Sequence, residues 1–168
     1  MAEAARGNGE AGAPLPAADP VEAQPLIINA QYVKDLSFEN PRAPQSLTQP
    51  TSAPDVAINV DIKARNLGPS VFEVVLTVNV DARAQDEPLF LVELAYAAVV
   101  TVKNTPEPML AGLILVETPR LMFPFARAII ADATRDGGFP PLMINPIDFG
   151  ELLRRQPQAF TEVGGTPV

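Results

Sequence analysis

Three segments of the chain alternate apolar and polar residues with a period of two, which is typical of strands that bury one face. In Asp55–Leu67 the apolar side chains fall on one face and the charged side chains on the other. Val71–Arg83 repeats this pattern after a turn, and Ile27–Phe38 follows it with an interruption at Lys34. We therefore expect three strands that each turn one face toward a core.

A fourth segment, residues 89–102, carries apolar side chains on both faces of the strand that it predicts. One face would hold Phe90, Val92, Leu94, Tyr96, Ala98 and Val100, and the other Leu89, Leu91, Glu93, Ala95 and Val99. A strand that is buried on one face should alternate as its neighbours do, so we expect something to cover the second face as well. Four strands in succession with short turns favour an antiparallel sheet.

The second half of the chain changes to a helical period. Pro108–Glu117 is a short, almost wholly apolar helix candidate. Thr118 is suited to cap a second helix that has Pro119 in its first position, and Pro124 offers an alternative start for the same helix. The apolar stripe of this helix would comprise Leu121, Phe125, Ala128 and Ile129.

The glycine pair Gly137-Gly138 should end this helix, because glycine readily adopts the left-handed conformation found at helix ends. Phe139–Pro146 is then expected to return in an extended form, and Asp148 to cap a last short helix over Phe149–Arg155. The connection Glu39–Pro54 holds four prolines and is expected to cross between strands without regular structure. Strands followed by helices predict an α+β fold: a four-stranded antiparallel sheet backed by a long helix and a short C-terminal helix.

Composition divides the chain into a domain and two extensions. Residues 1–25 contain eight Ala, four Pro and three Gly without a periodic apolar pattern, which predicts a disordered extension. Residues 26–155 would form the domain, and residues 156–168 a flexible, weakly charged tail. The first ten residues lack the apolar run of a signal peptide, and no apolar run approaches the ~20 residues that span a bilayer. We therefore expect a soluble cytoplasmic protein.

The net charge of −8 narrows the classes of partner. Nucleic acids and anionic membranes attract clusters of Lys and Arg, so neither is an expected partner, whereas basic proteins are. The chain has no His and no Cys, which excludes imidazole bases, Ser–His–Asp triads, thiolate metal sites and disulfides. We expect a protein without cofactor, metal or enzymatic activity, and without direct insertion into a membrane.

Carboxylates are the remaining candidates for acid–base chemistry. Those considered are Asp35, Glu39, Asp55, Asp61, Asp81 and Glu93. Most are expected to be solvated charges on the outer faces of strands. Glu93 differs because it lies between apolar residues, and two interpretations stay open: an interface residue, or a salt bridge to Lys63 or Arg65.

The segment Tyr32–Pro41 closely resembles the opening strand and turn of the SecB family of bacterial export chaperones. Further motifs resemble that family in the same order and at matching spacing: Val71–Val78, Leu89–Glu93, Leu121–Arg127, Gly137–Leu142 and Asn145–Phe149. The resemblance covers roughly residues 27–155. Phe125 departs from the family's helix motif, where a tyrosine is common, and the weakly charged tail departs from the acidic tails frequent in the family.

The resemblance implies a homotetramer, built as a dimer of dimers, that binds unfolded precursor polypeptides and passes them to the motor ATPase SecA. It implies that the long helix lies at the contact between dimers and that the protein has no catalytic activity. In the family SecA docks on an acidic patch of the sheet, and the matching positions here are Asp35, Glu39, Leu91 and Glu93. Clients lie in long hydrophobic grooves, which the resemblance assigns to Leu47, Phe90, Ile147, Phe149 and Leu152.

Two other classes of function are compatible with the same sheet and helices. A small-molecule binding or carrier domain would have a pocket enclosed within one protomer. A carboxylate-dependent hydrolase would show turnover without an added metal. The leading hypothesis is an export chaperone that holds unfolded chains, because extended clients offer apolar side chains to a long groove and an acidic surface attracts basic partners.

Overall fold

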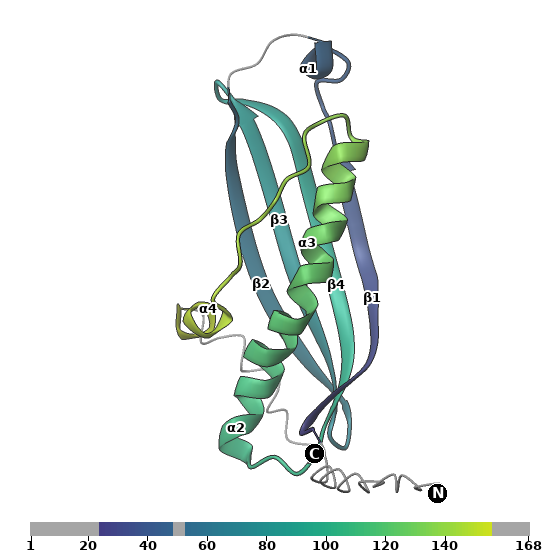
Figure 1. Cartoon of the computed structure of the whole chain (residues 1–168), viewed down its shortest axis with the longest axis vertical. Coiled ribbons are helices and arrows are strands. Elements are labelled where there is room, and N and C mark those ends of the chain that lie inside the picture. Colours follow the sequence, from purple (N-terminus) through teal and green to yellow (C-terminus); the bar gives the residue numbers. More distant parts are fainter. Residues whose placement is uncertain (1–23, 49–52, 156–168) are drawn as a thin grey trace, which may run out of the picture.

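A four-stranded antiparallel sheet with helices on one face forms the body of the protein in the computed structural model, which describes residues 24–48 and 53–155 (Figure 1). The strands are β1 (Leu26–Glu39), β2 (Asp55–Gly68), β3 (Val71–Ala84) and β4 (Glu87–Val102). They lie in the order β1-β4-β3-β2. The predicted fold class is confirmed, whereas the predicted extension and tail lie outside the described residues except for Gln24 and Pro25.

The turn between β3 and β4 explains why these two strands pair along their whole length. It consists of Gln85 and Asp86, which have φ angles of 53° and 66°. Two successive residues with positive φ are the signature of the hairpin turn that matches the twist of antiparallel strands. The strand β1 joins on the far side of β4, so the strand that is apolar on both faces lies inside the sheet.

A single helical rod covers one face of the sheet (Figure 1). It consists of α2 (Glu107–Gly112), a π-helical turn η1 (Leu113–Glu117) and α3 (Thr118–Asp136) without a break between them. By length and composition the rod could also cross a bilayer, but here it lies along the sheet and supplies side chains to the core. The separate short helix that we expected before Thr118 is therefore the first part of one longer helix.

Thr118 was predicted to cap the start of a helix. It does not, because its backbone is already helical with φ −60° and ψ −55°. Its amide and its hydroxyl both donate to the carbonyl of Leu113, the hydroxyl at 2.8 Å. This bond over five residues defines the wider π-helical turn. The wider turn directly precedes Pro119, whose ring would clash with a carbonyl in a regular helix. Pro124 does not start the helix either and lies inside α3.

The predicted apolar stripe of the long helix lies mostly on the exposed side of α3, and of its four residues only Ile129 packs against the core. Leu121 and Phe125 are 48% and 52% exposed, and Ala128 is exposed as well. The buried positions of α3 include Met122, Phe123, Ala126 and Ile130. Both sides of this helix are apolar over these turns, so the sequence period could not tell which side meets the sheet.

The segment after the helix folds back across the sheet as predicted (Figure 1). Gly138 ends the helix region with a φ of +91°, and the buried hydroxyl of Thr134 accepts the amide proton of Leu142 at 2.9 Å, which holds the return against α3. The last helix is α4 (Phe149–Arg155). Asp148 caps it, because its Oδ1 accepts the amide proton of Glu151 at 2.9 Å.

The connection between β1 and β2 differs from the prediction. It contains one turn of helix, α1 (Gln45–Thr48), where no regular structure was expected. The hydroxyl of Ser46 in this turn donates to Oδ1 of Asn40 at 2.7 Å, which fixes the turn to the end of β1. Residues 49–52 of the connection lie outside the described part of the chain.

Candidate functional site

Two irregularities in β1 determine which of its side chains lie on the face of the sheet away from the helices, here called the outer face. The register with β4 skips Asn29 and Lys34. Each skipped residue reverses the alternation of the residues that follow. As a result Tyr32 lies beside Ala97 on the outer face, although the simple alternation placed it on the same face as Phe38.

The four residues of the predicted acidic patch lie together on the outer face. Glu39 pairs with Leu91, Glu93 with Ser37, and Asp35 with Ala95. Paired residues of adjacent strands point to the same side of a sheet, so Asp35, Glu39, Leu91 and Glu93 share this face. The three carboxylates are exposed and Leu91 is half-buried, which leaves an apolar contact between charges. We keep the name acidic patch for these four residues.

The two interpretations of Glu93 are now separated. Arg65 binds Glu73 instead of Glu93, and no salt bridge in the described part of the chain involves Glu93 or Lys63. The predicted alternative of a salt bridge to Lys63 or Arg65 is therefore wrong, because the register places both cations in other rows of the sheet.

Asp81 is a neighbour of the acidic patch that the sequence did not reveal. It lies on β3 directly opposite Leu91, and it holds Arg83 at 3.0 Å. The sequence pattern correctly predicted that the Asp81 side chain points away from the core. It could not predict the register between β3 and β4. That register is what makes Asp81 a neighbour of the patch and not a distant surface charge.

The outer face of β4 is partly covered by the chain itself. Ala97 is fully buried, and Tyr32 lies beside it in the adjacent strand. Leu89, which the alternation placed on the outer face, is 2% exposed and belongs to the core, because the pairing between β3 and β4 shifts at Ala82 and Arg83. The expectation that this second face is covered is thus met in part by intramolecular contacts.

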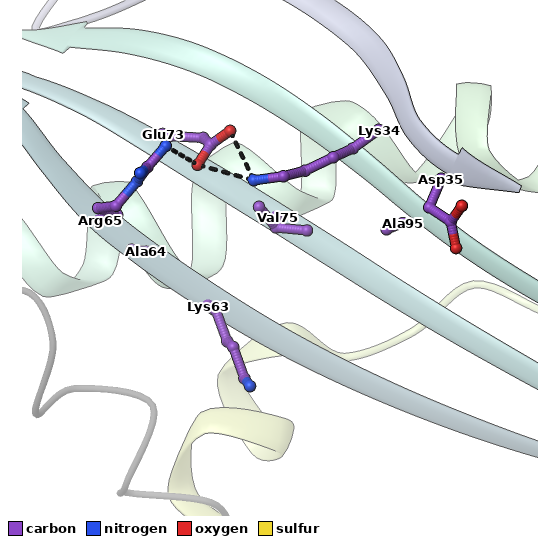
Figure 2. A pocket seen from close by; sticks show the side chains of 8 residues that line it. All are labelled: Lys34, Asp35, Lys63, Ala64, Arg65, Glu73, Val75 and Ala95. Atoms are coloured by element: carbon purple, nitrogen blue, oxygen red, sulfur yellow. Dashed lines mark hydrogen bonds and ion pairs between the residues drawn. The ribbon is translucent and has the colours of Figure 1, made fainter.

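A buried carboxylate, Glu73, joins three strands on the outer face (Figure 2). Its oxygens accept hydrogen bonds from the Tyr32 hydroxyl, from Lys34 Nζ at 3.0 and 3.1 Å and from Arg65 Nη2 at 2.9 Å. The residue is 4% exposed. Chiefly through the Tyr32 bond, and then through Lys34, these partners lower the pKa of Glu73 to about 2 against the opposing effect of burial. The same bond raises the pKa of the Tyr32 hydroxyl.

Glu73→Gln should destabilise the protein at neutral pH and not at strongly acidic pH. A carboxylate with a lowered pKa contributes stability above its unfolded value of about 4.5, and this contribution is lost as the pH falls toward the folded value of about 2. We expect a loss on the order of 2–3 kcal/mol at pH 7. Urea unfolding followed between pH 7 and pH 2 should show the two proteins converge, and a constant difference over that range would contradict the assignment.

The five residues expected to form a client groove fall into two separate places. Phe90 stacks on Phe38 with ring centres 5.9 Å apart and contacts the tilted ring of Phe139 at 4.8 Å, near the end of α3. Gly137 and Gly138 permit this packing, because a Cβ on Gly137 would lie 2.1 Å from the Phe38 ring and one on Gly138 3.0 Å from Leu47. Leu47, which is 47% exposed, thus belongs to this end of the protein.

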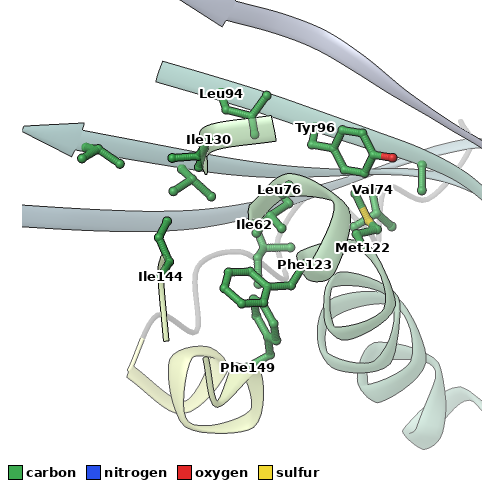
Figure 3. Close-up of a cluster of buried hydrophobic side chains, with 14 of the residues drawn as sticks. Ile62, Val74, Leu76, Leu94, Tyr96, Met122, Phe123, Ile130, Ile144 and Phe149 are labelled. Carbon is green, nitrogen blue, oxygen red and sulfur yellow. The ribbon is translucent and has the colours of Figure 1, made fainter. Parts of the chain in front are cut away.

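The other groove residues lie at α4, beyond the extended return. Phe149 packs edge-on against Phe123 at 5.9 Å, within the core that Figure 3 shows. Phe149 is 3% exposed and Phe90 4% exposed, so both are core side chains of the protomer and not open surface. Ile147 and Leu152 are half-buried. The sequence could not separate core from groove here, because an apolar residue on a short helix suits either.

Comparison with known proteins identifies the family to which the chain is similar. A sequence model of the family described as Preprotein translocase subunit SecB matches residues 20–159. The protein-export protein SecB of Rhodospirillum centenum is 48% identical over 154 residues, which cover 91% of this chain and 89% of that protein. The protein of the same name from Afipia carboxidovorans is 52% identical over 130 residues, covering 77% of this chain and 81% of that protein.

A solved structure shows the same fold. The SecB-like chaperone of Mycobacterium tuberculosis, in complex with a peptide from an antitoxin, superimposes with a TM-score of 0.60 at 16% identity, covering 73% of this chain and 90% of that chain. At that identity the likeness concerns the fold alone. The family match and the curated relatives both extend over most of the sequence, and on these grounds the chain belongs to the SecB family of protein-export chaperones.

Proposed function

We propose that this protein holds unfolded precursor polypeptides on one surface and delivers them to the motor ATPase SecA through another. The observation that carries the proposal is the clustering of three exposed carboxylates around Leu91 on the outer face. The opposite face of the sheet is covered by helices, and the exposed side chain of Leu47 on α1 lies beside Gly138 at the end of α3. Two partners of different chemistry can therefore be bound at the same time.

The acidic patch is the proposed docking site for SecA. Asp35, Glu39 and Glu93 supply charge that attracts a basic segment and raises the rate of association. Leu91 supplies an apolar contact that persists when salt screens the charges. Together the four residues would attract SecA from a distance through their charges and hold it through a specific contact.

Clients are proposed to bind over the apolar surface at the two ends of the extended return. Leu47, Ile147 and Leu152 offer partly accessible side chains there. Phe90 and Phe149 would form the floor beneath them, because they are buried within the protomer. Many weak apolar contacts along one surface bind extended chains without a strict sequence requirement.

We further propose a homotetramer, arranged as a dimer of dimers, that works in the cytoplasm. Leu121 and Phe125 on α3 and Val33 and Leu36 on β1 are large apolar side chains that are exposed in the protomer, and a second copy of the chain is the proposed cover for them. SecB is a chaperone family and not an enzyme family, so neither the hydrolase nor the carrier interpretation is pursued.

Leu47→Ala should weaken client binding by about 1 kcal/mol, which corresponds to about fivefold, through lost apolar contact. Binding of a permanently unfolded, apolar protein by calorimetry and suppression of its aggregation by light scattering would measure the effect. Leu67→Ala is the matched control, because Leu67 is also 47% exposed but lies at the end of β2 and not on α1. Equal effects of both substitutions would contradict a client site at α1.

Phe149→Ala serves as a second comparison and not as a binding probe. Removal of a buried phenylalanine typically costs 3–5 kcal/mol of folding stability, and Phe149 is buried against Phe123. Circular dichroism should therefore show a lowered melting temperature for this variant and an unchanged one for Leu47→Ala. A stable Phe149→Ala variant that fails to bind clients would show that Phe149 contributes to client binding and not to the stability of the core.

A further inference from the structure

A hollow of about 430 Å³ lies on the outer face next to the acidic patch (Figure 2). It is lined by Lys34, Asp35, Lys63, Ala64, Arg65, Glu73, Val75 and Ala95. The lining residues come from all four strands, so the hollow is a feature of the assembled sheet. Neither the family motifs nor the sequence pattern had pointed to it.

The hollow follows from the sizes of the side chains in each strand. The central strands contribute Ala95 and Val75, which are short, while the flanking strands contribute long side chains such as Lys34 and Lys63. Short residues between two rows of long ones leave a depression with an apolar floor and polar walls. Figure 2 shows the charged side chains bordering this floor.

The side chains that line the hollow carry more positive than negative charge. Lys34, Lys63 and Arg65 contribute three cations, and Asp35 and Glu73 contribute two carboxylates, so the lining has one net positive charge. Glu73 binds both Lys34 and Arg65. Lys63 is exposed and forms no salt bridge in the part of the chain that the structure describes. The side chain of Arg65 is 66% exposed and binds Glu73 through Nη2, which leaves most of its five N–H donors available to another acceptor.

The position of the hollow relative to the acidic patch is fixed by the register. Asp35 belongs to both, at the border between them. Lys63 shares a row with Val75 and Ala97, whereas Glu93 shares a row with Asn79 and Asn59. Lys63 therefore lies four residues beyond the row of Glu93, which is about 13 Å along the strand direction. One docked protein segment can span both places.

We infer that the hollow receives an acidic side chain of the same protein that docks on the acidic patch. The inference rests on the proposed function, because it requires a partner on the outer face. In a chain with a net charge of −8, a cationic site beside an acidic one attracts a segment that carries charges of both signs in a fixed order. The reverse orientation would bring like charges together, so the pair of sites sets the orientation of the partner.

The test compares a charge reversal at Lys63 with a charge reversal at Lys103. Lys63→Glu should weaken binding of purified SecA about tenfold at low ionic strength, and Lys63→Gln about threefold, because reversal adds repulsion to the loss of attraction. Lys103→Glu is the matched control, since Lys103 is exposed but lies outside the hollow. Calorimetry or surface plasmon resonance gives the affinity, and urea unfolding confirms that each variant is folded.

The outcomes separate this inference from the proposed docking site. If Lys63→Glu binds SecA as the wild type does while Glu93→Lys does not, the inference is overturned and the docking proposal stands. Equal losses for Lys63→Glu and Lys103→Glu would overturn it as well, because net charge alone would then explain them. A loss for Lys63→Glu and Lys63→Gln that Lys103→Glu does not share, alongside the loss for Glu93→Lys, supports the inference, whereas a loss of client binding in place of SecA binding overturns it. If Glu93→Lys leaves SecA binding intact, the docking proposal fails and the inference, which rests on it, is overturned with it.

Discussion

A chain that carries lysine at both Leu121 and Phe125 should no longer form a tetramer. These two side chains are 48% and 52% exposed in the protomer, on the side of α3 turned away from the core. Ala128 continues the same face about one turn further along. Large apolar side chains grouped on one side of a helix are normally covered, and the proposed assembly supplies a second copy of the chain as the cover.

The expected effect is large because each contact between copies is symmetric. Each of the two side chains contributes on the order of 1 kcal/mol of burial, and a symmetric contact contains each of them twice. Lysine also adds the cost of burying a charge. We therefore expect the dissociation constant of the assembly to rise about 1000-fold or more. Native mass spectrometry or light scattering at micromolar concentration would show the smaller species.

The matched control for this experiment is Met143→Lys. Met143 is 63% exposed, but it lies on the extended return and not on α3. This variant should keep the mass of the wild type, and circular dichroism should show that both variants are folded. A double variant with the mass of the wild type, or a wild-type chain that is monomeric at micromolar concentration, would contradict the proposed contact.

Strand periodicity predicted the directions of side chains well only where the strands pair without irregularities. In β3 the predicted inward residues Val74, Leu76 and Val78 are fully buried. In β1 the same reasoning misplaced Tyr32, because the register skips Asn29 and Lys34. A skipped residue depends on the partner strand and on tertiary contacts such as the Glu73 hydrogen bonds, so a single strand sequence does not reveal it.

The burial of individual apolar side chains was hard to predict where apolar residues were too abundant to be informative. Met122 is buried and Leu121 is exposed, although both are equally suited to a core. Phe149 was assigned to a groove through its place in a family motif, and the structure buries it against Phe123. The family resemblance supplied the class of the protein and the acidic residues, whereas burial of each apolar side chain depends on how α3 and α4 pack.

The site was easier to predict on the outer face than on the inner one. Charged residues on alternating positions can point only outward, so Glu39 and Glu93 had to share a face once their strands were adjacent. The sequence did not predict the register between β3 and β4. This register brings Asp81 opposite Leu91, and it builds the hollow beside Lys63 from residues that are scattered through the sequence.

Glu93→Lys should reduce the affinity for SecA about 100-fold, while client binding and the mass of the assembly stay unchanged. Glu93 is exposed and lies on the outer face, in the row next to Leu91 and Glu39. The substitution replaces attraction for a basic segment by repulsion and adds no steric clash with the core. Raised salt should weaken the wild-type complex through screening and leave a remaining affinity that depends on Leu91.

Two further charge-reversal variants test how far the proposed docking site extends beyond the acidic patch. Asp81→Lys should cause an intermediate loss, because Asp81 lies opposite Leu91 although it is not part of the acidic patch. Glu107→Lys should cause little loss, because Glu107 is exposed in the first turn of α2 and far from this face of the sheet in the chain's fold. Affinities measured by calorimetry at the same ionic strength would rank the three variants. Equal losses for Glu93→Lys and Glu107→Lys would mean that the overall negative charge of the protein, and not the acidic patch, recruits SecA.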